Sequence, residues 1–239
     1  SVFNISAMSF GSLSAAAIEA LNQGAKLGGF AHDTGEGAIS PYHKKHGGDL
    51  IWELGTGYFG CRNHDGTFSA EKFAERSRIE QVKMIEIKLS QGAKPGKGGV
   101  LPKEKITPEI AETRDVLMDV DCISPASHSA FTTPREMVQF WQQLRELSGG
   151  KPVGFKLCVG QPWQFMAIVK AMIEADNYPD FIVVDGAEGG TGAAPVEFMD
   201  NVGMPLLDGF LLVHNTLVGA GVRDKIKIGV SGKIISAFD

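Results

Sequence analysis

Short apolar segments alternate with helical patterns along this chain, and that alternation constrains the fold more than any other feature. Apolar, β-branched segments begin near residues 4, 30, 84, 121, 153, 181 and 226, and helical patterns follow most of them. Strands separated by helices form parallel sheets, because each helix returns the chain to the same end of the sheet. We predict one α/β domain over residues 1–239, a parallel (β/α)8 TIM barrel. Such a barrel needs eight strands, so the seven segments predict a barrel truncated before the eighth strand.

Helix signals support this interpretation. We expect helices at 15–27, 70–78, from 107, at 133–147, 162–175, 196–201 and 206–219, and a last one beginning at residue 232. Residues 50–61 fit the alternation poorly and are interpreted as an antiparallel excursion. A doubly wound open sheet is the alternative fold. The glycine-rich loops come late, and no G-x-G-x-x-G follows the first strand, which favours the barrel.

Composition excludes several classes of function. The net charge of −5, with no basic run interleaved with aromatic residues, argues against nucleic acid as a partner. The apolar runs are too short to cross a bilayer, and no signal peptide is visible, so we expect no membrane segment and a cytoplasmic location. The three cysteines lack metal-ligand or disulfide spacing and predict buried free thiols in a reducing compartment. We expect no metal site, since His43 and His46 have no third ligand nearby.

One long loop carries cationic and amide donors. An apolar run at 84–89 leads into QGAKPGKGG at 91–99, too rich in Gly and Pro to continue a regular element. A helix signal follows at Thr107 and Pro108, and that helix carries Arg114. The loop suits an anionic ligand, and a solvated connector explains it equally well.

If the fold is a barrel, the informative residues all lie at the carboxyl-terminal ends of its strands. They are Met8, Ser9, Glu36, Gln91, Lys94, His128, Lys156, Gly189, Gly190, Thr191, Gly192 and Gly232. Lys156 lies in an apolar strand, so it must find an anion or a polarisable acceptor; the alternative is an internal carboxylate such as Asp185. The glycine loop 189–192 can offer backbone N–H groups to a phosphate or a flavin edge, or it is simply a tight turn.

Several of these residues belong to motifs that resemble a known family. They are MSFGS at 8–12, TGEG at 34–37, QGAKPGKGG at 91–99, Arg114 twenty positions after Lys94, the lysine-bearing strand 153–157, and GGTGAAP at 189–195. Together they resemble the FMN-binding synthase domain of glutamate synthases. The resemblance covers nearly the whole chain and is strongest to stand-alone glutamate-synthase-like proteins, which lack the glutaminase module.

The resemblance implies a barrel that holds FMN and reduces the imine formed from 2-oxoglutarate and ammonia. It places Met8 and Ser9 at the flavin ring and Gln91 between flavin and substrate. Lys94 and Arg114 would hold the substrate carboxylates, and Glu36 would lie near the incoming nitrogen. Lys156 would face the N1/O2 edge of the flavin. Glu36, Lys94 and Gln91 are thus the expected catalytic residues; the remaining expected flavin contacts are Gly189, Gly190, Thr191 and Gly232.

The chain also departs from the family pattern. Residues 124–130 keep one histidine, His128, where the family has two, and Ser231-Gly232-Lys233 stands where the family has Asp-Gly-Gly. The family's iron–sulfur ligands lie downstream, so a cluster is expected only if the native protein continues past Asp239. Expected partners are 2-oxoglutarate or a related dicarboxylate, glutaminase and electron-donor subunits, and further copies in an oligomer. Two alternatives stay open: an N-methylglutamate-synthase-type subunit that uses another amine donor, and a non-catalytic barrel fragment that acts as a binding or assembly subunit.

Overall fold

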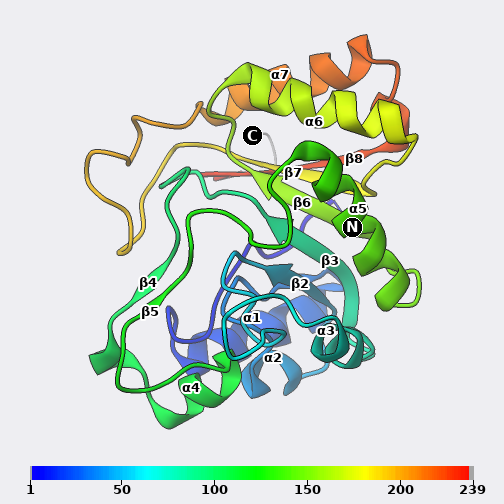
Figure 1. Ribbon diagram of the computed structural model, residues 1–239. Coiled ribbons are helices and arrows are strands. Elements are labelled where there is room, and N and C mark those ends of the chain that lie inside the picture. Colours follow the sequence, from blue (N-terminus) through cyan, green and yellow to red (C-terminus); the bar gives the residue numbers. More distant parts are fainter. Residues whose placement is uncertain (1, 237–239) are drawn as a thin grey trace.

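The computed structural model describes residues 2–236, and its centre is a curled, six-stranded sheet (Figure 1). The strand order is β1 (His32–Asp33), β2 (Leu50–Leu54), β3 (Val82–Lys88), β6 (Val153–Leu157), β7 (Phe181–Asp185) and β8 (Lys227–Ser231). Every pairing between neighbours is parallel, and a parallel bridge from Ile5 to His32 continues the sheet beyond β1. The predicted α/β fold with a parallel sheet is confirmed, as an open, curled portion of a barrel.

The helices begin where the sequence places its caps. They are α1 (Ala15–Gly28), α2 (Pro41–Lys44), α3 (Ala70–Ser77), α4 (Pro108–Arg114), α5 (Pro134–Leu147), α6 (Pro162–Ala175) and α7 (Leu206–Gly219), with 3-10 turns at Lys103–Lys105 and Arg223–Lys225. The side chains of Ser14, Thr107 and Thr133 accept hydrogen bonds from the first turns of α1, α4 and α5. Among the described residues, no helix combines the length and apolarity that a bilayer crossing requires.

The main core lies between the sheet and the helices that cover its outer side. The Trp52 ring of β2 stacks on Phe73 of α3 at 5.2 Å between centroids, and Trp141 of α5 stacks on Phe155 of β6 at 6.1 Å. Because side chains alternate along a strand, the neighbours of Trp52 in β2 and of Phe155 in β6 point to the inside of the curl. That inner side carries buried charged groups, among them Glu53 and Lys156, as well as apolar residues such as Ile51.

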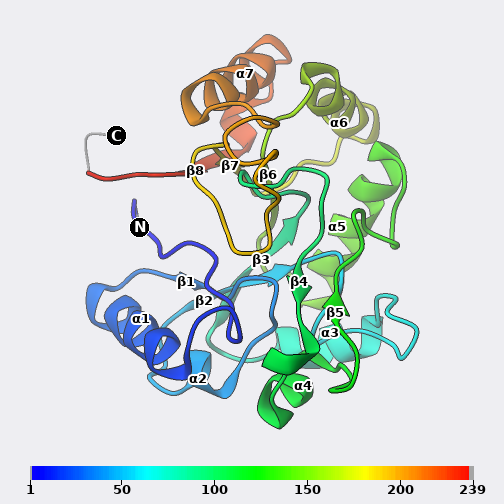
Figure 2. The same cartoon turned by 90° about the vertical axis from the view of Figure 1, so that its left-hand side faces the viewer.

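Two predicted strands are wrong in detail. Residues Leu50–Leu54 form β2, which pairs in parallel with β1 and β3, and not an antiparallel excursion. The segment near 121 does not enter the sheet: Cys122–Ile123 (β5) pairs antiparallel with Val100–Leu101 (β4) in a separate ribbon near α4 (Figure 2). Strand β6 therefore pairs directly with β3.

Two predicted helices are also absent. Residues 196–201 form consecutive turns instead of a regular helix. Several of their hydrogen bonds, such as Asn201 N–H to the Phe198 carbonyl, span only three residues. No helix begins at Gly232 within the part of the chain up to residue 236, and residues 237–239 lie outside the described residues.

Candidate functional site

A cavity of about 470 Å³ opens at the carboxyl-terminal ends of the strands. Its walls come from the segment before α1, the loops that follow β1, β3 and β7, and the end of α4. The sequence-predicted residues that line it are Met8, Ser9, Glu36, Gln91, Lys94, Arg114, Lys156, Gly190 and Thr191. Ligands of parallel α/β barrels bind at this face, so the cavity is the candidate functional site.

Two predicted flavin contacts do not line this cavity. The Gly189 N–H donates a hydrogen bond to Asp200 Oδ1 at 3.0 Å, so that amide already has an acceptor. Gly232 packs against Gly186, where a Cβ would come within 3.0 Å of the Gly186 nitrogen. The loop after β7 therefore contributes Gly190 and Thr191 to the wall but not Gly189, and Gly232, which follows β8, does not line the cavity either.

The amino-terminal wall is held by backbone contacts. The Met8 N–H donates to the Asp33 carbonyl at 3.1 Å, and Ser9 Oγ accepts from the Gly37 N–H at 3.2 Å. Gly35 has a φ of +64°, and a Cβ there would overlap Ser9 Oγ. A glycine is needed at this position, because any side chain would push the Ser9 wall away from the loop that carries Glu36.

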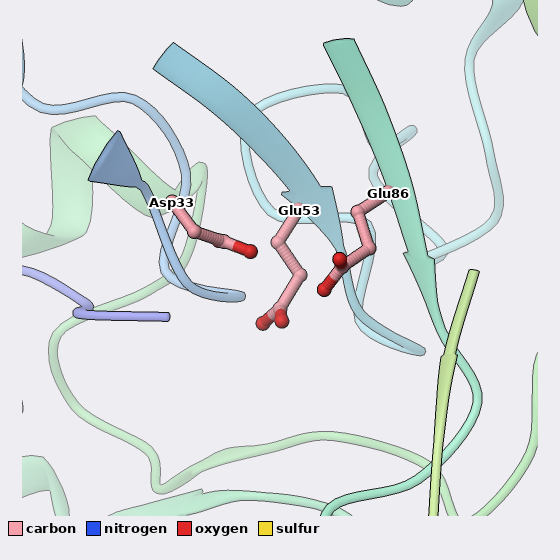
Figure 3. Close-up of side chains that lie close together, drawn as sticks. All are labelled: Asp33, Glu53 and Glu86. Carbon is pink, nitrogen blue, oxygen red and sulfur yellow. The ribbon is translucent and has the colours of Figure 1, made fainter. Parts of the chain in front are cut away.

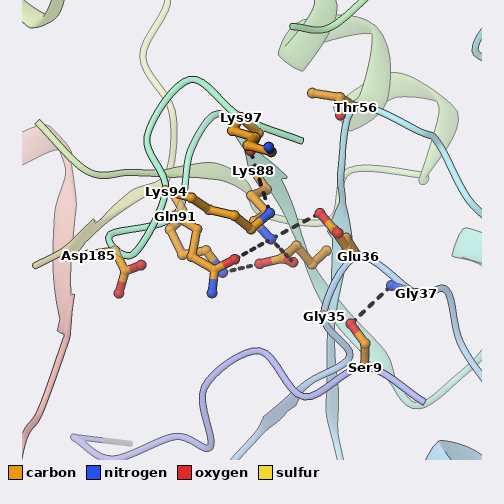
Figure 4. Close-up of polar contacts among 12 residues, drawn as sticks. Ser9, Gly35, Glu36, Gly37, Thr56, Lys88, Gln91, Lys94, Lys97 and Asp185 are labelled. Atoms are coloured by element: carbon orange, nitrogen blue, oxygen red, sulfur yellow. Dashed lines mark hydrogen bonds and ion pairs between the residues drawn. The ribbon is translucent and has the colours of Figure 1, made fainter. Parts of the chain in front are cut away.

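Glu36 forms an ion pair with Lys88, a cavity residue that the sequence analysis missed (Figure 4). Lys88 Nζ donates to Glu36 Oε2 at 3.0 Å and to Gln91 Oε1 at 3.3 Å. Burial opposes the ionisation of Glu36, but the charges of Lys88 and Lys94 outweigh it and lower its pKa to about 2. Lys88 and Glu86 are two residues apart in β3 and therefore lie on the same face of the sheet. Because a lysine in an apolar strand needs an anionic partner, the argument applied to Lys156 could have identified Lys88 as well.

Lys94 and Arg114 are the two cavity cations that lack an ion pair with any carboxylate of residues 2–236. Lys94 is 3% exposed, and its Nζ reaches only the Lys97 carbonyl at 3.5 Å; burial lowers the pKa of its ammonium. Arg114 is 4% exposed, donates from Nη2 to the Phe10 carbonyl at 2.9 Å, and stacks over the Phe59 ring at 5.4 Å. Both cations therefore line the cavity without an ion pair among the described residues, although the Glu36 carboxylate acts electrostatically on both.

Lys156 lines the cavity, but internal carboxylates neutralise it. Its Nζ forms ion pairs with Glu53 Oε2 and, at 3.3 Å, with Glu86 Oε1. The predicted alternative, an internal carboxylate such as Asp185, holds in kind, but the partners are Glu53 and Glu86. Asp185 instead accepts hydrogen bonds from the Gly92 N–H at 2.7 Å and from Ser231 Oγ at 2.5 Å. The carboxylates around Lys156 lie close enough together for a metal ion, but here the ammonium supplies the positive charge.

His128 acts on the site through the backbone of Lys88. Its Nε2 lies 2.8 Å from the Lys88 carbonyl, and its Nδ1 lies 2.9 Å from the Tyr58 hydroxyl. Burial lowers the pKa of His128 to about 4, so the ring is neutral at pH 7. A neutral ring fits this network when Nε2–H donates to the carbonyl and Nδ1 accepts from Tyr58. His128 thus fixes the end of β3 and does not reach the cavity.

The cysteines match the sequence prediction. Cys61, Cys122 and Cys158 are buried free thiols. Burial raises the pKa of Cys61 and of Cys158 to about 12, so both thiols stay protonated at neutral pH. Inert, protonated thiols of this kind have a packing role.

The fold and the site define an open parallel α/β barrel protein with a cavity at its strand ends that is lined by both cationic and carboxylate side chains. The family described as "Conserved region in glutamate synthase" matches residues 1–239, and the chain belongs to it. This chain is 43% identical over 232 residues to the glutamate synthase large subunit-like protein YerD of Bacillus subtilis. The match covers 97% of this chain and 44% of that protein.

Other comparisons agree with this assignment. An archaeal-type glutamate synthase (NADPH) of Thermotoga maritima is 35% identical over 234 residues, covering 98% of this chain and 43% of that protein. The chain thus spans less than half the length of these relatives. Among solved structures, the aldolase QR15 superposes with a TM-score of 0.51 at 16% identity, covering 98% of this chain and 80% of that one, which bears on the fold alone.

Proposed function

We propose that this chain forms the FMN- and substrate-binding barrel of a glutamate-synthase-type oxidoreductase, which reduces the imine of 2-oxoglutarate to an amino acid. One observation supports the proposal: Lys94 and Arg114 are buried, both line the cavity, and neither has an ion-pairing carboxylate among the described residues. A buried cation is costly unless it is paired. A dicarboxylate supplies one anion for each, and the planar guanidinium of Arg114 suits bidentate contact with a carboxylate.

The residues present fit an FMN ring. The cavity volume of about 470 Å³ lies within the range usual for cofactor sites, and its wall combines polar groups with the apolar surface of Met8 and Leu13. Met8, Ser9 and Gln91 would border the ring, with Gly190 and Thr191 opposite. FMN, when bound, supplies the hydride that reduces the imine carbon. Because Gly189 and Gly232 lie off the cavity, no phosphate contact is assigned to them.

The chain's own side chains would bind and orient the reactants. Lys94 and Arg114 fix the carboxylates of the oxo acid. Glu36 is ionised at neutral pH because its pKa is held near 2, so it accepts a hydrogen bond from ammonia or another amine that enters the cavity. Lys88 holds Glu36 and Gln91 in place through hydrogen bonds of 3.0 and 3.3 Å.

Flavin absorbance and oxo-acid binding in the full-length protein test this function. The wild type is expected to take up one FMN and to bind 2-oxoglutarate. Arg114→Lys keeps the charge but removes the planar fork, so it should weaken 2-oxoglutarate binding while flavin content is unchanged. After chemical reduction of the flavin, ammonia and methylamine are compared as amine donors, which separates glutamate from N-methylglutamate formation. Failure of the full-length protein to bind FMN would refute the proposal.

A further inference from the structure

Three carboxylates converge beneath the cavity from adjacent strands. Asp33 of β1, Glu53 of β2 and Glu86 of β3 point toward one another (Figure 3), and one oxygen of each lies within 4.8 Å of the others. Glu53 and Glu86 are direct partners in the strand register, and all three side chains are at most 4% exposed. Neighbouring strands are spaced about 4.8 Å apart, so carboxylates on one face of adjacent strands are held close together.

The charges of this cluster do not balance unless it holds a proton. Lys156 contacts Glu53 and Glu86, and Lys88 lies 3.9 Å from Glu53 Oε1. Lys88 is also the partner of Glu36 at 3.0 Å, so its charge is shared. The remaining group, Asp33, accepts from the Gly35 N–H at 2.8 Å, and one of its carboxylate oxygens lies within 4.8 Å of an oxygen of Glu86.

Two buried carboxylates this close together repel each other when both are ionised, so a proton on one of them is favoured. Burial, together with the nearby charge of Glu53, raises the pKa of Asp33 to about 7, and burial raises that of Glu86 well above its ordinary range. Two other charged groups face this cluster. Asp185 interacts electrostatically with Lys156, and Lys94 interacts electrostatically with Glu53. The pair formed by Asp33 and Glu86 thus holds one proton at neutral pH.

A continuous series of ionisable contacts leads from this pair to the cavity. Glu86 contacts Lys156, Lys156 contacts Glu53, and Glu53 contacts Lys88. Lys156, Glu53 and Lys88 line the cavity, whereas Asp33 and Glu86 lie behind it. The proton is therefore stored one layer below the surface that a substrate would touch.

We propose that the Asp33–Glu86 pair is a proton store for the cavity, and that it supplies the proton taken up by the substrate nitrogen during imine reduction. This proposal rests on the proposed function. Imine reduction would break the C=N π bond, form one C–H bond with the hydride that bound FMN would supply, and form one N–H bond with a proton. Lys88 gives that proton to the nitrogen. A proton then moves from Lys156 through the Glu53 carboxylate to the neutral Lys88 amine, and Glu86 reprotonates Lys156. The lysines keep their charge, the pair loses one proton, and water refills it after product leaves.

Infrared spectroscopy of the full-length protein tests the store without flavin or substrate. At neutral pH the exposed carboxyl groups are ionised, so a carboxylic acid C=O band reports a buried protonated group. The wild type is expected to show this band, and Glu86→Gln and Asp33→Asn are each expected to abolish it. Glu80→Gln, the same chemical change at an exposed position, should leave it intact. A wild type without the band, or a band that survives both variants, would overturn the proposal.

The kinetics of Glu86→Gln separate a proton store from a structural ion cluster. Glu86 does not line the cavity, so this variant should keep the KM for the oxo acid while kcat falls by about 100-fold, the lower end for general acid catalysis. An unchanged kcat overturns the store. If the full-length protein binds no flavin but shows the infrared band, only the proposed function fails; if flavin and oxo acid bind without the band, only the proton store fails.

Discussion

The Glu36–Lys88 ion pair should stabilise the barrel strongly at neutral pH and weakly in acid. The two side chains are 18% and 11% exposed, so solvent screens them little. The surrounding cations lower the pKa of Glu36 from an ordinary value of 4.5 to about 2. At about 1.4 kcal/mol per pH unit, that difference corresponds to about 3 kcal/mol. A depressed folded-state pKa gives stability that is fully present above pH 4.5 and lost as the pH falls through 2.

Glu36→Gln therefore should lower the free energy of unfolding by about 3 kcal/mol at pH 7 and by less than half of that at about pH 3. Hydrogen exchange of the β2 and β3 amides in the full-length protein measures this free energy for the barrel itself. Glu19→Gln is the matched control, because Glu19 pairs with Lys45 at 2.8 Å on a more exposed surface and should show a much smaller effect. A Glu36→Gln effect that is small, or equal at both pH values, would refute the reasoning.

Further predictions concern the loop after β3. Lys94→Met should weaken 2-oxoglutarate binding by roughly 10- to 150-fold, the equivalent of a charge-assisted hydrogen bond of about 1.5–3 kcal/mol, while Lys97→Met on the exposed part of the same loop should not. Since burial lowers the pKa of Lys94, 2-oxoglutarate affinity should fall with rising pH before the ordinary lysine range is reached; a flat calorimetric titration would contradict this. Gly92→Ala should disrupt the loop and abolish oxo-acid binding, because a Cβ there would overlap the Gly186 carbonyl oxygen; Gly192→Ala, with open space around it, should bind normally.

Helix boundaries were predictable because they depend on local chemistry. Thr107 with Pro108, and Thr133 with Pro134, place an N-cap directly before a proline at the first helical position, and α4 and α5 begin there. The cap hydrogen bond joins residues three apart in sequence, so no distant contact is needed to form it.

Strand membership was less predictable because it depends on partners far away in sequence. All five residues of β2 are buried, which removes the alternation of apolar and polar residues that marks a half-buried strand. Glu53 looks like a surface residue until Lys156, 103 positions later, is brought against it. Conversely, Cys122–Ile123 has strand-like residues, but its partner is β4 in a separate ribbon.

The candidate site shows the same contrast between features set by local sequence and features set by distant partners. The sequence identified most of the cationic wall, because glycine-rich loops and buried lysines are visible in it. It could not separate Lys156, neutralised by Glu53 and Glu86, from Lys94, which has no carboxylate partner in the described part of the chain. Lys88 was missed for a related reason, since its carboxylate partner Glu36 lies on the loop after another strand.

This division of the cations also bears on substrate selection. Lys88 and Lys156 already have internal carboxylates, so an anionic ligand gains little from them, whereas Lys94 and Arg114 have none within residues 2–236. A monocarboxylate oxo acid would satisfy one of these two charges and leave the other buried and unpaired, which is costly. In the proposed function, selectivity for a dicarboxylate would therefore arise from the penalty on the wrong ligand as much as from contacts with the right one. The internal carboxylates would add to this selectivity, because they neutralise lysines that could otherwise bind any anion.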